Sequence, residues 1–394
     1  MSSWPSFSKE ESEKVKKILL SNKVNYWTGE ECKKFEEEFA QFSHTKYAVS
    51  LSNGTVALDL ALKALDIGAG DEVIVTSRSF IASVSCIVNA GAIPVFADVC
   101  ENSQNITTTN IKNLITHKTK AIICVHLAGF PCEMQNINKL ASSHNLYVIE
   151  DCAQAHGARY KGKSVGSFGH IGCWSFCQDK IISTGGEGGM VTTNNKKLWE
   201  KMWSYKDHGK SYKKIYNHNN VSGFKWLHDS FGTNWRMMEF QAAIGRIQLK
   251  KINEWTKKRN HNQNTIWSIC NKFDALRVPE FNKKSWKGYH KDNIHAAYKC
   301  YVFVKPSKLK KGWSRNKIIE EISKNGVKCF SGSCSEIYLE KAFKKTDFKP
   351  RKRLKVAKRL GETSLMFLIH PTLTKKELKL TCDSISSIMK LASK

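Results

Sequence analysis

The stretch of sequence that decides the fold is Trp174-Ser175-Phe176-Cys177-Gln178-Asp179-Lys180-Ile181-Ile182-Ser183-Thr184-Gly185-Gly186-Glu187-Gly188-Gly189. An apolar run precedes Lys180, which stands at the edge of a loop that contains four glycines. Residues 190–193, after the loop, have the pattern of a strand. The chain has 63 lysines and arginines, so a lysine alone carries no information. A lysine fixed between a buried strand and a glycine-rich loop, however, can be held next to a ligand at short range.

An upstream strand ends in a carboxylate. The apolar residues 148–149 lead through Glu150 into Asp151, and Gln154 follows in the same turn. A lysine nucleophile together with an acid at a strand end is the pairing that a pyridoxal phosphate (PLP) enzyme needs. We therefore expect PLP as the cofactor, with Lys180 and Asp151 as the catalytic residues. The alternatives are an exposed loop lysine and an acid that caps the next turn.

Strands alternate with helices over the first 200 residues. We expect strands at 47–51, 72–76, 93–97, 121–125 and 146–150, and helices at 8–20, 30–42, 54–65, 80–90, 109–116 and 134–143. Short connections between such elements predict an α/β fold with a mainly parallel sheet that is covered on both faces. Ligands bind outside the carboxyl ends of the strands in such sheets, where Asn53-Gly54-Thr55, Asp151 and the Lys180 loop are expected.

The regular alternation fades after about residue 200. A helix is expected at 238–252, and from about residue 254 the composition shifts to Lys, Asn and Trp. A strand at 298–304 and helices at 317–325 and from 375 onward predict a smaller α+β unit. We expect a large PLP-binding α/β domain at 1–253 and a small C-terminal α+β domain at 254–394.

Length and composition narrow the class of protein. A chain of 394 residues with 41% apolar content can bury a large core. It has no run of about 18 apolar residues and no signal-peptide pattern at its start, so we expect no membrane span. Most of the 13 cysteines sit in apolar runs, which is typical of reduced thiols. We expect a cytoplasmic protein without disulfides or a metal site.

The net charge of +28 has three candidate explanations. The charge would attract a nucleic acid, assist an anionic small substrate, or reflect a lysine-rich composition on a solvated surface. The lysines are spread along the whole chain, and the densest stretch, 344–359, lacks the interleaved aromatic residues of a nucleic-acid platform. The pattern favours a solvated surface first and an anionic ligand second, and it argues against nucleic acid as a partner.

Several further residues suit the parts of the cofactor. Gly54 and Thr55 open a helix after a strand, where free N–H groups and the helix dipole suit a phosphate. Ser175 can donate its hydroxyl to the same phosphate, and Gln154 can bond the ring hydroxyl. Phe80, at a helix start, can stack on the ring. The alternatives are a buried hydroxyl, a solvated amide and an aromatic residue of the core.

These residues belong to a longer series of ordered sequence blocks. The blocks include Tyr26-Trp27-Thr28-Gly29, Ser52-Asn53-Gly54-Thr55-Val56-Ala57-Leu58, Gly70-Asp71-Glu72-Val73-Ile74-Val75, Glu150-Asp151-Cys152-Ala153-Gln154-Ala155-His156-Gly157-Ala158, Asp207-His208-Gly209 and Asn234-Trp235-Arg236-Met237-Met238-Glu239. From about Val24 to Ile252 the series resembles the DegT family of nucleotide-sugar aminotransferases, which are fold-type I PLP enzymes. The chain departs from the commoner pattern at Asn53 and Cys152, where both residues are small enough to be tolerated.

The resemblance implies a role for each matching residue. Lys180 binds the cofactor aldehyde, Asp151 pairs with the pyridine nitrogen, and Gln154 contacts the ring hydroxyl. Gly54, Thr55 and Ser175 hold the phosphate, and stacking by Phe80 rests mainly on the resemblance. Asn234 matches an asparagine that reaches the phosphate in the neighbouring subunit's site, so the resemblance also implies a homodimer with two shared active sites.

The resulting hypothesis is a PLP-dependent aminotransferase. It would move an amino group from an amino acid, expected to be glutamate, to a nucleotide-linked keto-deoxy sugar for a polysaccharide or glycan. A branch of the family that carries histidine in place of the lysine performs dehydration, so Lys180 favours amine transfer. Two rivals are a PLP-dependent sugar dehydratase and a non-enzymatic regulatory protein that binds nucleic acid. The sugar, the nucleotide and the position of amination are not fixed by the sequence.

Overall fold

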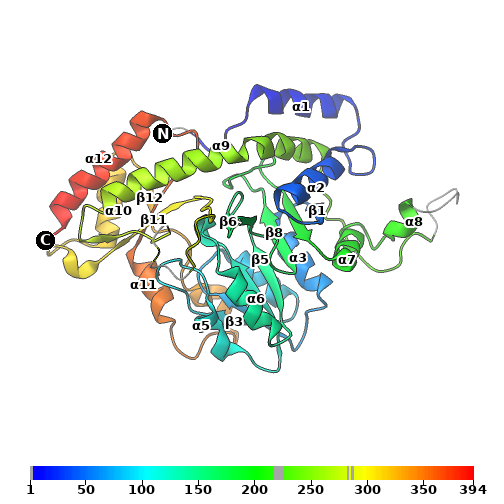
Figure 1. Ribbon diagram of the computed structural model, residues 1–394, viewed down its shortest axis with the longest axis horizontal. Coiled ribbons are helices and arrows are strands. Elements are labelled where there is room, and N and C mark those ends of the chain that lie inside the picture. The colour runs from blue at the N-terminus through cyan, green and yellow to red at the C-terminus, as the bar shows by residue number, and fades with distance from the viewer. Residues whose placement is uncertain (1–2, 217–225, 282–283, 285–287) are drawn as a thin grey trace.

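Seven strands form the central sheet of the computed structural model, which describes residues 3–216, 226–281, 284 and 288–394 (Figure 1). Their order is β1-β9-β8-β5-β4-β2-β3. The strands are β1 (Tyr47–Leu51), β2 (Glu72–Thr76), β3 (Ile93–Ala97), β4 (Thr119–Val125), β5 (Tyr147–Asp151), β8 (Ile171–Ser175) and β9 (Gly189–Thr193). Strand β9 is antiparallel to both neighbours, and the other pairs are parallel. The predicted mainly parallel sheet is confirmed.

Both faces of this sheet are buried, as expected. Along β2, Val73 and Val75 belong to one apolar cluster, whereas Ile74 between them belongs to another on the opposite face. The helices that accompany the sheet are α2 (Glu31–Phe42), α3 (Gly54–Ala64), α4 (Ala82–Asn89), α6 (Met134–Ser142) and α7 (Lys196–Lys206). Each fully buried branched side chain contributes roughly 1.5–3 kcal/mol, so the strands need cover on both sides.

The N-terminal helices largely match their predicted bounds. Helix α1 (Lys9–Leu20) begins with the predicted capping box, in which Ser8 and Glu11 bond each other's backbone. Figure 1 shows α1 lying along the long helix α9. The helix expected at 109–116 is shorter, because α5 (Thr108–Ile111) passes into a 3-10 turn at Lys112–Leu114.

Helix α9 runs from Glu239 to Cys270, so the predicted end at residue 252 is wrong. Beyond that residue the helix buries one face at helical spacing, but the buried residues are largely polar. They are Thr256, Arg259, Asn262, Gln263, Ile266, Trp267 and Cys270. A search for apolar periodicity misses such a face. The predicted boundary at 253/254 falls inside this helix, and the division into two domains stays a prediction.

The C-terminal third contains an antiparallel sheet of order β10-β11-β13-β12. Its elements are β10 (Leu276–Arg277), β11 (Cys300–Val304), α10 (Arg315–Lys324), β12 (Cys329–Phe330), α11 (Lys355–Thr363), β13 (Ser364–Phe367) and α12 (Lys375–Ala392). Its core also includes the end of α9. Helix α11 was not predicted, because it begins in the lysine-rich stretch 344–359, which has the composition of a charged surface.

The remaining described elements are short. They are the hairpin β6 (Arg159–Tyr160) and β7 (Lys163–Ser164), α8 (Tyr212–Tyr216), and 3-10 turns at Leu127–Gly129, Pro306–Lys308, Ile337–Leu339 and Lys341–Phe343. None of the described helices is both long and apolar enough to cross a membrane. All thirteen cysteines are free thiols, and most of them are buried.

One buried cluster has the composition of a metal site. His126, Glu150 and Cys152 lie close together, the one such group among the described residues. The imidazole Nδ1 of His126 accepts the N–H of Cys132 at 3.0 Å, and its Nε2 lies 3.0 Å from Glu150. The Glu150 carboxylate also accepts the N–H of Gly166 at 2.8 Å. These bonds occupy both imidazole nitrogens of His126 and the Oε2 atom of Glu150, so the cluster joins the end of β5 to the neighbouring loops.

A second histidine, His156, is fully buried between the rings of Trp174 and Phe176. Neither ring nitrogen has a hydrogen-bond partner among the described residues. Burial, reinforced by the positive charges of Lys180 and Arg259, lowers the pKa of this imidazole to about 3. His156 is therefore neutral at pH 7, but it lacks the hydrogen bonds that an ordinary buried histidine makes.

We expect His156→Phe to reduce the acid sensitivity of the fold. The pKa of this imidazole is about 6.5 when unfolded and about 3 when folded, so the unfolded state binds more protons between these values. The neutral imidazole therefore contributes its full share to the free energy of unfolding above pH 6.5. That contribution falls as the pH is lowered toward 3, and the loss is about 2 kcal/mol at pH 5. Urea unfolding at pH 7 and pH 5 should show about that difference between wild type and variant. The exposed His144→Gln is the control, and equal acid sensitivity of His156→Phe would contradict the assignment.

Candidate active site

A cavity of about 1040 Å³ lies at the carboxyl edge of the large sheet. Strands β1, β5 and β8 point the same way, so the segments that follow them meet at this edge. Seven of the predicted site residues line the cavity: Gly54, Thr55, Phe80, Asp151, Gln154, Ser175 and Lys180. The fold therefore brings together segments that are more than 100 residues apart in sequence.

Asp151 ends β5 and is 5% exposed. Its Oδ2 accepts the hydroxyl of Ser83 at 2.7 Å, and its Oδ1 accepts the N–H of Ala153 at 3.1 Å. No lysine, arginine or histidine of the described residues forms an ion pair with this carboxylate. A buried carboxylate held by two donors but lacking a cation suits a protonated nitrogen of a bound ring.

Ser83 was not identified from the sequence. It lies in α4, where its hydroxyl is also 2.9 Å from that of Ser79. A serine in an apolar helix gives no local signal of this contact, which depends on where the fold places α4 relative to the end of β5.

Gln154 lies in the turn after Asp151. Its side-chain oxygen accepts the N–H of Ala128 at 2.8 Å. This bond fixes the orientation of the amide and leaves its NH₂ group as the donor. A donor at the cavity wall suits the ring hydroxyl that the sequence assigned to Gln154.

The first turn of α3 lies against the ends of β8 and β9. Asn53 caps the helix by accepting the N–H of Val56 at 3.0 Å, which leaves the N–H groups of Gly54 and Thr55 for an anion. A Cβ at Gly54 would lie 2.5 Å from the Cβ of Ser175, so glycine is needed for this approach. The Ser175 hydroxyl thus stands beside a helix N-terminus, as a phosphate cradle requires.

Lys180 follows β8 in a turn closed by its N–H and the carbonyl of Cys177 at 3.0 Å. Its Nζ lies 3.7 Å from Asp179 Oδ1 and 5.3 Å from the centre of the Tyr298 ring. Its own carbonyl accepts the indole N–H of Trp4 at 2.8 Å. The N-terminal segment therefore fixes the turn that carries this lysine, and no sequence pattern indicated that contact.

Two predicted residues have surroundings that differ from those of the rest. Phe80 is 67% exposed although it lines the cavity, so it does not belong to the core. Asn234 is exposed, pairs with Asp207 through the backbone and does not line this cavity. The stacking role of Phe80 and the contact of Asn234 with another subunit's phosphate stay predictions.

Tyr298 and Lys299 also line the cavity, and the sequence assigned them no role. They directly precede β11, where residue 298 was expected to begin the strand. The Tyr298 hydroxyl donates to Asp179. The Nζ of Lys299 lies 4.0 Å from the same carboxylate, and burial lowers the pKa of this ammonium to about 8.

The donor set fits PLP. The α3 N-terminus with Ser175 suits the phosphate, Asp151 suits the ring nitrogen, Gln154 suits the ring hydroxyl, and Lys180 can reach an aldehyde in the same cavity. Among the described lining residues, Lys180 and Lys299 are the two lysines, and no arginine is present.

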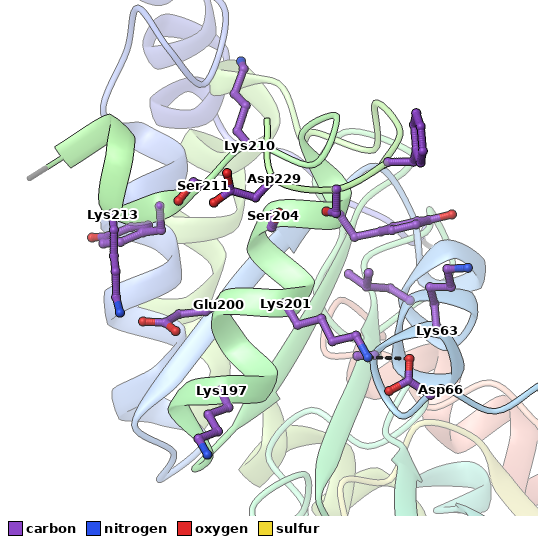
Figure 2. A pocket seen from close by; sticks show the side chains of 16 residues that line it. Lys63, Asp66, Lys197, Glu200, Lys201, Ser204, Lys210, Ser211, Lys213 and Asp229 are labelled. Atoms are coloured by element: carbon purple, nitrogen blue, oxygen red, sulfur yellow. Dashed lines mark hydrogen bonds and ion pairs between the residues drawn. The ribbon is translucent and has the colours of Figure 1, made fainter. Parts of the chain in front are cut away.

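A second cavity, of about 470 Å³, is bordered by α3, α7 and residues 210–213 and 229–231. Figure 2 shows Lys210 pointing in the opposite direction to Lys197 and Lys213, so the three side chains do not converge on one point. Lys201 instead pairs with Asp66 at 2.6 Å. Lys210 pairs with Asp207 at 3.1 Å, and Lys197 and Lys213 are exposed to solvent, so the cavity does not resemble an anion site.

Comparison with known proteins agrees with this geometry. The sequence model of the DegT/DnrJ/EryC1/StrS aminotransferase family matches residues 5–386. The GDP-perosamine synthase of Escherichia coli O157:H7 is 36% identical over 386 residues, which cover 97% of this chain and 96% of that protein.

Two solved structures are similar over nearly their whole length. An aminotransferase from Psychrobacter cryohalolentis has a TM-score of 0.97 at 60% identity, covering 99% of this chain and 98% of that one. S. venezuelae DesV, solved in complex with a ketimine intermediate, has a TM-score of 0.85 at 28% identity, covering 97% and 94%. These likenesses confirm the predicted fold-type I PLP architecture.

We expect Gly54→Ala to weaken cofactor retention. The added Cβ would lie 2.5 Å from Ser175 and push α3 away from β8, which would separate the two sides of the phosphate cradle. Loss of one charge-assisted hydrogen bond, about 1.5–3 kcal/mol, would weaken PLP binding at least about tenfold. Absorbance after dialysis measures the bound cofactor. The control is Gly68→Ala, whose Cβ would meet its nearest atom at 3.6 Å. If the Gly54→Ala variant retained as much PLP as wild type, the assignment of the phosphate site would be contradicted.

Proposed function

The chain belongs to the DegT/DnrJ/EryC1/StrS aminotransferase family, and we propose that it transfers an amino group from glutamate to a keto-deoxy sugar linked to a nucleotide. It is a nucleotide-sugar aminotransferase that uses PLP. The observation that carries the proposal is that Lys180 and the buried, cation-free Asp151 line one cavity with a phosphate cradle. At about 1040 Å³ this cavity is large enough for a cofactor with a further ligand beside it.

Each side chain has a distinct task in this proposal. Bound PLP supplies an electron sink for the carbon that loses its proton. Lys180 takes up and returns that proton, and Asp151 keeps the ring nitrogen protonated. Gln154 orients the ring through its hydroxyl, while Ser175 and the first turn of α3 hold the phosphate in place.

Amine transfer is better supported than the two rivals. The dehydratase alternative depends on histidine in place of Lys180, and this chain has the lysine. A regulatory nucleic-acid-binding role would rest on net charge alone, whereas the similar proteins include a GDP-perosamine synthase and an aminotransferase. The family that matches nearly the whole chain is one of aminotransferases.

We further propose that the enzyme works as a cytoplasmic homodimer with shared active sites. Trp226 and Phe231 are 84% and 99% exposed in the single chain, and Asn234 lies exposed close to them in sequence. Two large apolar side chains in water suit burial against a second copy. The free thiols support a reducing compartment. We expect the choice of sugar and nucleotide to depend on loops such as residues 206–231, of which 217–225 lie outside the described residues.

The direct test is to incubate the holoenzyme with glutamate and a panel of keto-sugar nucleotides and to follow the products by mass. We expect one substrate to become an amino sugar as glutamate becomes 2-oxoglutarate. A product that lacks a hydroxyl, formed without loss of glutamate, would indicate a dehydratase. If no substrate accepts the amine and no donor is consumed, the proposed reaction is wrong.

Two substitutions should separate the roles of the catalytic pair. Lys180→Ala should lower turnover by about 10²–10⁴-fold, the usual contribution of a positioned acid or base. Asp151→Asn should lower turnover by about 10–10³-fold while the protein stays folded, because an opposite charge at contact distance shifts a pKa by about 1–3 units. Steady-state rates measure both effects. Asp347→Asn, at an exposed carboxylate, is the control. Near-normal turnover in Lys180→Ala would exclude its assigned role.

A further inference from the structure

A smaller cavity of about 290 Å³ shares a wall with the active-site cavity. Asp179, Tyr298 and Lys299 line both of them. The other residues that line it are Ser3, Trp4, Arg259, Lys328, Leu368, Ile369 and His370. It is therefore formed between the turn that carries Lys180, the N-terminal segment, helix α9 and the residues after β13.

Arg259 is the unusual member of this cavity. Its side chain is 1% exposed, yet no carboxylate of the described residues pairs with it. Its Nη1 donates to the carbonyl of Tyr298 at 3.4 Å, whereas Nε and Nη2 have no hydrogen-bond partner among the described residues. The Trp4 ring lies 4.8 Å from the guanidinium carbon. A buried cation with unused donors is costly unless an anion joins it.

The other charges around the cavity do not neutralise this arginine. Lys299 and Lys328 add two further cations, and Asp179 is the one acid among the described residues that line the cavity. That carboxylate already accepts the Tyr298 hydroxyl and lies 3.7 Å from Lys180 Nζ.

The protonation states agree with a surplus of positive charge. Burial lowers the pKa of Arg259 to about 9 and that of Lys299 to about 8, so both remain mainly charged at pH 7. His370 adds no charge, because burial lowers its pKa to about 4. The cavity thus has more cations than anions.

We propose that Arg259, Lys299 and Lys328 bind a carboxylate group of the amino-acid donor. The inference rests on the proposed function, since a transaminase must hold a donor whose carboxylate lies near the reacting amine. Lys299 borders both cavities, and Lys180 is the other lysine among the described residues of the larger one. A carboxylate bound to Lys299 would therefore lie between the catalytic lysine and the unpaired donors of Arg259. A space of about 290 Å³ suits a short dicarboxylate better than a nucleotide.

Binding can be tested without catalysis. Glutarate has two carboxylates but no amine, so it cannot react, and titration calorimetry on the PLP-loaded holoenzyme measures its affinity. Charge-assisted hydrogen bonds predict that Arg259→Gln weakens glutarate binding at least about tenfold. Lys317→Gln, which removes a charge elsewhere in the C-terminal third, should bind glutarate as wild type does. Inorganic phosphate is the second probe, and binding of phosphate without competition by glutarate would overturn the assignment to a carboxylate.

Kinetics give a second readout. Arg259→Gln should raise the KM for glutamate at least about tenfold and leave the KM for the sugar nucleotide unchanged. Lys299→Gln should act in the same direction, so the proposal stays testable if the buried arginine is needed for folding. Unchanged glutarate affinity and unchanged glutamate KM in the folded variants would overturn it. That result differs from failure of the proposed function, in which the wild-type holoenzyme itself transfers no amine from glutamate.

Discussion

The site depends on the close approach between the first turn of α3 and the ends of β8 and β9. Gly54 lies against Ser175, and a Cβ at Gly189 would lie 2.2 Å from the carbonyl oxygen of Asn53. Because no side chain fits between these backbones, the helix N-terminus, the serine hydroxyl and the start of the Lys180 turn occupy one small volume. Asp151 reaches the same volume because β5 pairs with β8 in parallel register.

Helix α9 connects this edge of the sheet to the C-terminal third. Near its start, Glu239 accepts the N–H groups of Glu31 and Cys32 and so caps α2. Farther along, its buried polar face includes Arg259, which bonds the carbonyl of Tyr298 at 3.4 Å. The Tyr298 hydroxyl in turn donates to Asp179, which holds the segment before β11 beside the Lys180 turn. The cavity needs this contact, because Tyr298 and Lys299 form part of its wall.

The parts of the site that the sequence predicted are those whose signal is local. A strand followed by a glycine and a helix start predicts an anion site, and a carboxylate at a strand end predicts a position at the sheet edge, so Gly54 and Asp151 were found. Ser83, Tyr298 and Trp4 act through contacts with residues far away in sequence, and no periodicity or spacing marks them. The end of α9 was missed because its buried face is polar, and a pattern based on apolar residues has no means of detecting it.

Burial and pairing decide which of the cations behind the net charge of +28 indicate a ligand. Lysines such as Lys197 and Lys213 are exposed to solvent, where water and salt screen them, so their number alone indicates no ligand. Arg259 differs because it has lost water without gaining an anion. Water satisfies the hydrogen-bond donors of a solvated cation at any surface position, whereas a buried cation requires a protein or ligand partner. For a chain this basic, burial and unused donors therefore identify an anion site better than charge density does.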